Sequence, residues 1–564
     1  MRFSKRFFVF TILIVFALIW KFNNWNDRYA AVEAFRGAAL NEDVLYPLMS
    51  KNLNDAGQLK ININGETYSN SQQYAILDDG LNPVGSLEFV RTIMGSSAFM
   101  SGEKSAIVQI TNDIYEFTVG ENVITKNGEE ADITVAPSMR KGQIYLGLED
   151  LCKIFGYEYS YDKAKYTVDI QYHTKPRLPA AYDLRKLNRV SHIRNQGSKS
   201  TCWACASVEA LESALLPAYP HTFSVDAMIN ENSQGDESKG GEYTKALAYL
   251  LSWQGPVEED DNVESKPVHL QSAQFFDSEN LDEIKRAVYN YGGVSTSIYA
   301  SVSTSNLNGS ISYNSFTNSY CYNGSAKPNH DVVIIGWDDN YPAKNFSSNV
   351  EGNGAFICQN SWGDGFGDDG VFYISYYDSN IGYQAVAYVS VDTHNTYSYI
   401  YQSDLSGWVG QVGFGKAWAY AANTFMAKAD QQVEATGFYA LGKDTTYHVY
   451  FVPKYENTGS LSEKVLVAKG KVEQPGYYTI KFNSPQPVTK DEEFAVVLYL
   501  NTPDTIRPIA VEYEAEDKVV DLTDGKGFIS NNGLNWEHVE EVKSANLCIK
   551  AYANNLVEVY DNEE

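Results

Sequence analysis

Hydrophobic and polar residues alternate with a strand-like period in the early part of the chain, over residues 60–68, 106–110 and 115–119. The period then changes. Leu148, Leu151 and Phe155 are spaced as on one side of a short helix, and Gly156 is placed to end it. These patterns predict a small domain of mixed helix and strand over residues 60–173.

The middle and the end of the chain have different patterns. Residues 174–392 mix helical and strand-like stretches, with Val208, Leu211 and Leu215 on one face of a helix that Pro217 stops. Residues 395–556 contain strand-like runs between Gly, Asn and Pro turns, at 449–452, 477–482, 494–500 and 547–552. That spacing predicts an all-β sandwich.

A basic and then apolar segment begins the chain. Arg2, Lys5 and Arg6 precede an apolar run over residues 7–20. This run is long enough for the apolar core of a signal peptide, but no clean small-x-small cleavage site follows it. We therefore expect residues 1–25 to be a signal peptide or a membrane anchor and residues 26–59 to be a linker, with the rest outside the membrane.

Composition narrows the functional classes. With 564 residues, the chain is expected to form about three or four domains. Its 44 lysines and arginines against 71 aspartates and glutamates give a formal net charge of −27, which argues against nucleic acid as a partner. Six cysteines are too few for a disulfide scaffold in a chain of this length.

The strongest chemical signal is a cysteine where a loop becomes a helix. Cys202 is expected at the helix N-terminus, where the positive end of the helix dipole lowers the pKa of a thiol. Gln196 lies upstream on the same loop. Its side-chain amide and the backbone N–H of Cys202 are candidate donors to an oxyanion.

Two further polar residues complete a nucleophilic apparatus. His330 begins a continuous apolar strand, and Asn360 ends another strand just before a glycine-rich loop. Nucleophile, base and base-orienting amide therefore occur in the order Cys202, His330, Asn360.

These passages resemble the papain family of cysteine peptidases through Gln-Gly-x4-Cys-Trp-Ala, Asn-His-x-Val and Asn-Ser-Trp-Gly. The resemblance covers about residues 177–392. It implies a papain-like fold, made of a helical subdomain and a β-barrel-like subdomain, that needs no cofactor. It also implies that Gly240 and Gly241 line the substrate cleft and that Trp362 covers the contact between His330 and Asn360.

The flanking segments carry resemblances of their own. Residues 142–172 are similar to the N-terminal domain of copper amine oxidases, which implies a stalk or spacer over residues 60–173 and no copper. Residues 395–556 resemble the lectin-like domain of clostridial cell-surface cysteine proteases. The predicted fold class is thus multidomain α+β: a small stalk domain, a papain-like domain and a C-terminal all-β sandwich, followed by an acidic tail at 557–564.

Two positions depart from the family pattern. Lys199 stands where many papain-like enzymes have a disulfide-forming cysteine, and Cys205 stands where an aromatic residue is usual. Residues 26–175 show no helical inhibitory propeptide. These departures remove no catalytic group but change the floor of the cleft.

Other chemistries compete for the same residues. Cys202 and Cys205 form a C-x-x-C pair, which suggests thiol–disulfide exchange, but that chemistry does not account for His330 or Asn360. A structural calcium ion near Asp364 and Asp368, or in the β-rich part, stays open, since no spaced ligand motif indicates one.

The sequence therefore predicts an endopeptidase that acts outside the cell, membrane-anchored, secreted or attached to the cell wall. Its partners are expected to be protein or peptide substrates, cell-wall glycan at the C-terminal domain, and the membrane at the N-terminal segment. The alternative is a surface protein that binds glycan or cell wall and uses an inactive peptidase scaffold.

Overall fold

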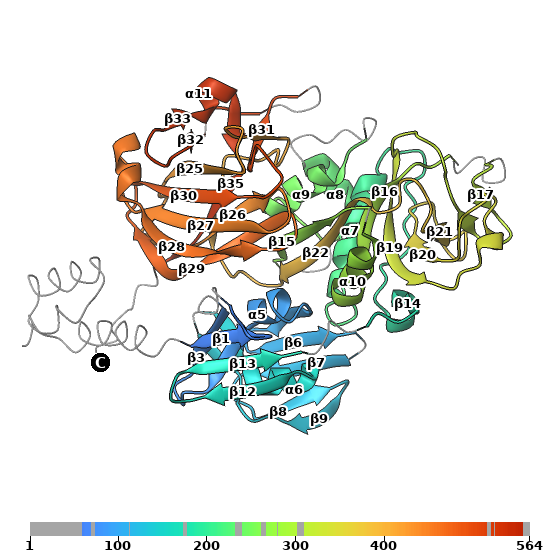
Figure 1. The fold of residues 1–564 in the computed structure, drawn as a ribbon, viewed down its shortest axis with the longest axis horizontal. Helices are drawn as coiled ribbons and strands as arrows, with labels where there is room; N and C mark the ends of the chain where they lie inside the picture. Colours follow the sequence, from blue (N-terminus) through green and yellow to red (C-terminus); the bar gives the residue numbers. More distant parts are fainter. Residues whose placement is uncertain are drawn as a thin grey trace, which may run out of the picture.

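The computed structural model describes residues 59–556, except 69–73, 112, 141, 173–176, 232–239, 261–266, 279, 302–309, 516–519 and 524. Three domains follow one another along the chain (Figure 1). The expected signal peptide or anchor, nearly all of the 26–59 linker and the acidic tail lie outside the described residues. Within the described ranges, no helix is both long and apolar enough to cross a membrane.

Within its described residues, the N-terminal domain packs two short helices against three small sheets around one apolar core. The predicted helix is present as α6 and ends at Gly156, whose φ of 69° suits a residue without a side chain. The elements are β1 (Lys60–Ile63), β2 (Glu66–Thr67), β3 (Ala75–Leu77), β4 (Pro83–Ser86), α5 (Leu87–Thr92), β5 (Ser97–Gly102), β6 (Ser105–Ile110), β7 (Asp113–Thr118), β8 (Val123–Lys126), β9 (Glu129–Asp132), β10 (Ser138–Arg140), β11 (Gln143–Gly147), α6 (Leu148–Phe155), β12 (Glu158–Asp162) and β13 (Thr167–Gln171).

The central domain surrounds one buried helix with strands. Helix α7 (Cys202–Leu215) is buried from Trp203 to its end, and it packs against β19 and β22. The other elements are β14 (Ala181–Asp183), α8 (Val225–Glu231), α9 (Tyr243–Leu251), β15 (His269–Phe276), α10 (Leu281–Tyr291), β16 (Val294–Ile298), β17 (Tyr313–Asn314), β18 (Ser319–Tyr320), β19 (His330–Asp338), β20 (Ala355–Gln359), β21 (Val371–Ser375) and β22 (Tyr383–Asp392).

The C-terminal domain is the predicted sandwich, because residues of two facing sheets share one apolar core. Strands β26, β29 and β35 lie in one sheet, and β25, β27 and β30 lie in the other. The elements are β23 (Tyr399–Tyr401), β24 (Gly410–Val412), β25 (Trp418–Met426), β26 (Gln431–Ala440), β27 (Thr445–Val452), β28 (Val465–Val472), β29 (Gly476–Val488), β30 (Glu493–Asn501), β31 (Ile509–Tyr513), β32 (Gly527–Ser530), β33 (Glu537–His538), α11 (Val539–Lys543), β34 (Ala545–Leu547) and β35 (Ile549–Asn555).

The central and C-terminal domains share a sheet. Strand β15 pairs with β22 of its own domain on one side and with β29 of the C-terminal domain on the other. In this second pairing, Gly476 lies opposite Gln274. Tyr439 and Tyr477 of the C-terminal domain also belong to the apolar core of the central domain. The two domains are therefore joined by backbone hydrogen bonds and by a common core.

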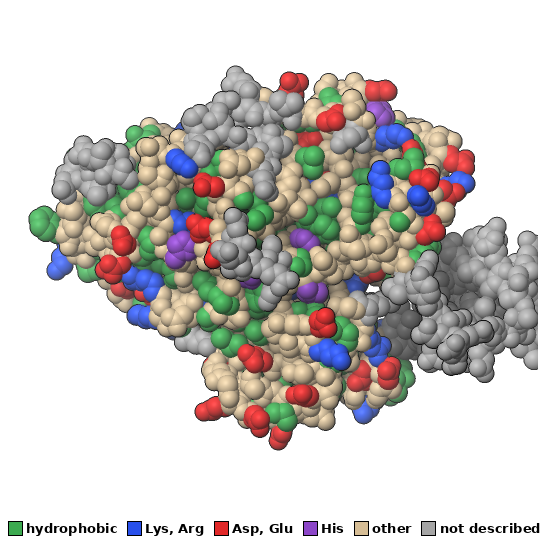
Figure 2. Space-filling model, turned by 180° about the vertical axis from the view of Figure 1, so that it is seen from behind, with side chains coloured by type: hydrophobic (Ala, Val, Ile, Leu, Met, Phe, Trp, Pro, Cys, Tyr) green, Lys and Arg blue, Asp and Glu red, His purple; other side chains and the backbone are tan. Residues whose placement is uncertain are grey.

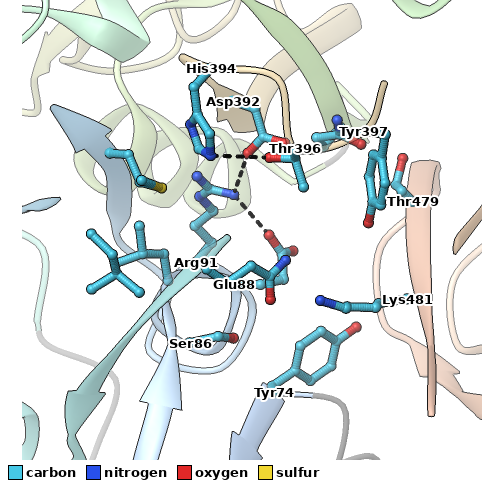
Figure 3. Close-up of a pocket in the computed structure, with 15 residues that line it drawn as sticks. Tyr74, Ser86, Glu88, Arg91, Asp392, His394, Thr396, Tyr397, Thr479 and Lys481 are labelled. Atoms are coloured by element: carbon cyan, nitrogen blue, oxygen red, sulfur yellow. Dashed lines mark hydrogen bonds and ion pairs between the residues drawn. The ribbon is translucent and has the colours of Figure 1, made fainter. Parts of the chain in front are cut away.

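The N-terminal domain, expected to be a spacer, packs against the central domain through α5 (Figure 3). Arg91 is 5% exposed and its guanidinium lies between the two domains. It donates to Ser390 Oγ at 2.8 Å and forms ion pairs with Glu88 at 3.0 Å and Asp392 at 3.4 Å. The Thr393 hydroxyl donates to the Met100 carbonyl. Arg91 and Thr393 thus have polar partners across this contact.

Charged side chains are mixed on the face that Figure 2 shows. Acidic and basic groups lie among one another there, over all three domains. On this face, therefore, acidic and basic side chains are interspersed and do not form separate patches.

Substitution Gly476→Ala is expected to destabilise the protein. A Cβ atom at this position would lie 2.1 Å from the Ala273 carbonyl oxygen, so β15 and β29 would have to separate. The expected loss is about 1–3 kcal/mol of unfolding free energy, measured as a lower midpoint of thermal unfolding. Gly365→Ala is the matched control, because no atom lies within 4 Å of its Cβ position. Equal midpoints for both variants would contradict this account of the junction.

Candidate active site

Cys202 is the first residue of α7, as predicted, and it is the helix residue that stays partly exposed. The Thr201 carbonyl accepts from the backbone N–H groups of Ala204 and Cys205, both at 3.1 Å, and so starts the helix. The backbone N–H groups of Asp331, Trp203 and Cys202 act to lower the pKa of the Cys202 thiol. The sulfur therefore lies where unpaired helix N–H groups meet the start of β19.

His330 and Asn360 are brought together by adjacent antiparallel strands. Their side chains are 6% and 1% exposed, and His330 Nε2 lies 2.8 Å from Asn360 Oδ1. The same oxygen accepts from the Ser361 backbone N–H at 2.8 Å. Because Oδ1 is an acceptor, His330 Nε2 carries the proton of this bond, and Nδ1 of the neutral ring is left as a proton acceptor.

Trp362 stacks on the His330 ring, with centroids 4.8 Å apart and planes 28° from parallel. Phe366 meets Trp362 edge to face at 5.0 Å. The indole therefore packs beside the imidazole.

Gln196 lies against the segment that carries Asn360. Its backbone N–H donates to the Ser361 carbonyl at 2.9 Å, and Ser361 Oγ donates to Gln196 Oε1 at 2.6 Å. Gln196 Nε2 donates to the Lys199 carbonyl at 2.8 Å. An amide nitrogen has two protons, so this bond leaves Gln196 one further proton to donate.

Gly240 and Gly241 lie beside the start of α7. Gly240 has a φ of 70°, and a Cβ at Gly241 would lie 2.7 Å from the Trp203 ring. The second glycine is therefore required for close contact with the helix. Lys239, which precedes them in the predicted motif, lies outside the described residues.

Burial opposes charge on both reacting groups. Burial raises the pKa of Cys202 to about 12, and the Asp331 carboxylate adds to this rise. Burial lowers the pKa of His330 to about 4, although the hydrogen bond with Asn360 acts in the opposite direction. The expectation of a lowered thiol pKa is thus wrong for this site. A charge on one group can form only together with the opposite charge on the other.

A buried ionic network supports the loop that leads to Cys202. Arg194 binds Glu212 of α7 through two hydrogen bonds of 2.6 and 2.9 Å, and the Arg194 carbonyl accepts from the Gly363 N–H at 2.9 Å. Glu209 of α7 is 1% exposed, and burial raises its pKa to about 8. Sequence reasoning missed this network, although two glutamates in an otherwise apolar helix were a usable signal.

Other candidate groups take no visible part in the site. Cys205 is buried with a free thiol. Asp368 accepts from Arg185 at 3.1 Å. Among the described residues, no group of three or more His, Cys, Asp and Glu side chains could hold a metal ion.

Three family profiles match the chain in series. Residues 62–170 match the copper amine oxidase N-terminal domain, residues 178–391 the papain family cysteine protease, and residues 400–553 the lectin like domain. All three predicted resemblances are confirmed.

Curated relatives are similar over part of the chain. A cysteine protease of Blomia tropicalis is 26% identical over 254 residues, covering 40% of this chain and 70% of that protein. Cathepsin S of Mus musculus is 28% identical over 225 residues, covering 36% of this chain and 61% of cathepsin S. The matched part thus spans less than two thirds of the cathepsin.

Two solved structures are similar over a larger part. The clostridial cysteine protease Cwp84 after propeptide cleavage has a TM-score of 0.58 and 23% identity, covering 67% of this chain and 99% of that one. The second structure contains the cysteine protease and lectin-like domains of Cwp84, a surface layer associated protein of Clostridium difficile. It has a TM-score of 0.58 and 24% identity, and the match covers 68% of this chain and 90% of that one. The likeness confirms the predicted multidomain fold.

Substitution Glu209→Gln is expected to stabilise the protein at alkaline pH. A carboxyl group ionises near pH 4.5 in the unfolded chain but near 8 in this site, so stability falls as pH rises through that window. The variant should therefore unfold near the wild-type temperature at pH 4.5 and a few degrees higher at pH 8. The exposed Glu116→Gln is the control. A Glu209→Gln effect that does not change with pH would contradict this prediction.

Proposed function

Because residues 178–391 form a papain-family cysteine peptidase domain, between a copper-amine-oxidase-type N-terminal domain and a lectin-like domain, we propose that the chain is an extracellular endopeptidase. Cys202, His330, Asn360 and Gln196 carry the reaction. The 2.8 Å contact between His330 Nε2 and Asn360 Oδ1 is the main support, since it leaves His330 Nδ1 free to take a proton.

The reaction begins with proton transfer from the Cys202 thiol to His330. Each group alone resists charging, so the thiolate and the imidazolium form as a pair. The thiolate attacks the peptide carbonyl, while the Cys202 backbone N–H and the Gln196 amide donate to the oxyanion. His330 then protonates the leaving amine, and a water molecule deprotonated by His330 hydrolyses the thioester.

Three neighbouring residues position these groups. Asn360 holds the imidazole through Nε2, and Trp362 covers that hydrogen bond from one side. Gly240 has no side chain of its own, so an extended substrate strand can approach its backbone closely.

We extend the proposal to the location of this activity, which we assign to a cell surface. We assign the lectin-like domain to glycan or cell-wall binding, and residues 1–25 to membrane anchoring or secretion. The surface-layer association of the similar clostridial protein supports this location. The reaction of Cys202 with His330 requires no cofactor.

An inactive peptidase scaffold that only binds glycan is the second candidate. The observation in its favour is the burial of Cys202 and His330, which keeps both groups neutral in the free site. Reactivity of the thiol distinguishes the two candidates.

An epoxide inhibitor selective for papain-type thiolates is expected to label Cys202 once per molecule. Peptide mass spectrometry of the purified chain locates the label. His330→Ala should lose the label, because no base remains to take the thiol proton, whereas Cys205→Ser should keep it, because Cys205 is buried. An unlabelled wild-type chain under reducing conditions would favour the binding scaffold.

Cys202→Ala should abolish peptide hydrolysis and leave the thermal midpoint near that of the wild type. His330→Ala should lower kcat/KM by at least about 100-fold. Asn360→Ala should lower it less, because it orients the ring without exchanging protons. Equal losses for the last two variants would contradict the orienting role, and residual activity in Cys202→Ala would contradict the assignment.

A further inference from the structure

Asp331 follows His330 on β19, and the reaction described above does not use its carboxyl group. Ser297 Oγ, on the neighbouring strand β16, donates to Asp331 Oδ1 at 2.5 Å. Gln384 Oε1 of β22 lies 3.2 Å from the same Ser297 oxygen. Asp331 remains partly exposed, so a substrate can reach its carboxyl group.

This carboxyl group lies close to the nucleophile. The Asp331 backbone N–H and the Asp331 carboxylate both act on the Cys202 thiol: the N–H lowers the pKa of the thiol and the carboxylate raises it. A peptide whose carbonyl carbon is at Cys202 therefore has a neighbouring side chain within reach of Asp331.

A second carboxylate lies close enough to act on Asp331. Glu242 is exposed, follows Gly240 and Gly241 directly, and acts electrostatically on Asp331. In the part of the chain that the structure describes, no lysine or arginine forms an ion pair with Asp331. Asp331 and Glu242 are therefore two carboxylates that act on one another, and Asp331 has no described lysine or arginine as an ion-pair partner.

An aromatic side chain adjoins the two acids. Tyr383 pairs with Ser297 across β16 and β22 and is 46% exposed. It also interacts with Tyr243, which follows Glu242. Aromatic surface next to carboxylates suits a side chain with a long apolar stem and a positive end.

We propose that Asp331, assisted by Glu242, forms a specificity subsite for a lysine or arginine side chain next to the scissile bond. The inference rests on the proposed peptidase function. The physical reason is that a partly buried carboxylate is stabilised by a cation at hydrogen-bonding distance. In support, burial and Glu242 raise the pKa of Asp331 to about 7, and a substrate cation would favour its ionised form.

The test is cleavage-site sequencing of a peptide library with the full chain, followed by kinetics on matched peptides. The library should show lysine and arginine enriched at one position beside the scissile bond. Two peptides that differ there only by lysine or its neutral isostere norleucine then give a ratio of kcat/KM values. Asp331→Asn, which keeps the acceptor for Ser297, should lower that ratio by about tenfold or more. Asp338→Asn, on the same strand, is the charge-matched control and should keep the ratio.

A cleaving wild type without preference for cations would overturn the subsite and leave the peptidase function intact. An unchanged ratio of the kcat/KM values in Asp331→Asn would overturn the subsite in the same way. No cleavage and no label on Cys202 would instead contradict the peptidase itself. If Asp331→Asn fails to fold, Glu242→Gln takes its place: a lower ratio supports the subsite, and an unchanged ratio counts against it.

Discussion

The antiparallel pairing of β19 with β20 is the constraint on which the candidate site depends. It places the first residue of β19, His330, beside the residue that follows β20, Asn360, and the two side chains meet at 2.8 Å. Helix α7 packs on β19 and brings its first residue, Cys202, to the same end of the strand. A register shift of one residue would turn His330 to the opposite face of the sheet.

The sheet that the central and C-terminal domains share holds together the elements around this site. Strand β15 joins the central sheet to the C-terminal sandwich, and aromatic residues of the sandwich enter the central core. On another side, Arg91 of the N-terminal domain is buried among polar groups of the central domain. The strands next to His330 and Asn360 therefore lie within a structure of three packed domains, and movement of any one domain would require buried contacts to break.

Local sequence was sufficient for much of this arrangement. The α7 boundaries, the start of β19 and the end of β20 agree with apolar periodicity and with stop signals such as Pro217. The groups that sequence reasoning missed depend on distant partners. Arg194 is paired with Glu212 only in the folded chain, and Asp331 becomes notable only beside Cys202 and Glu242. The docking of the N-terminal domain was missed for the same reason, since Arg91 and Asp392 are far apart in sequence.

The sequence by itself determined the order of the domains, the elements that carry Cys202, His330 and Asn360, and the family resemblances, because these follow from local periodicity and from spaced motifs. The tertiary structure alone decided the charge state of the site and its surroundings. The expected helix-terminus effect on the Cys202 thiol is outweighed by burial, and burial is a property of every element packed around a group. The periodicity of the sequence indicates which face of one helix or strand is apolar. The pKa of a buried group depends instead on which helices and strands pack around it.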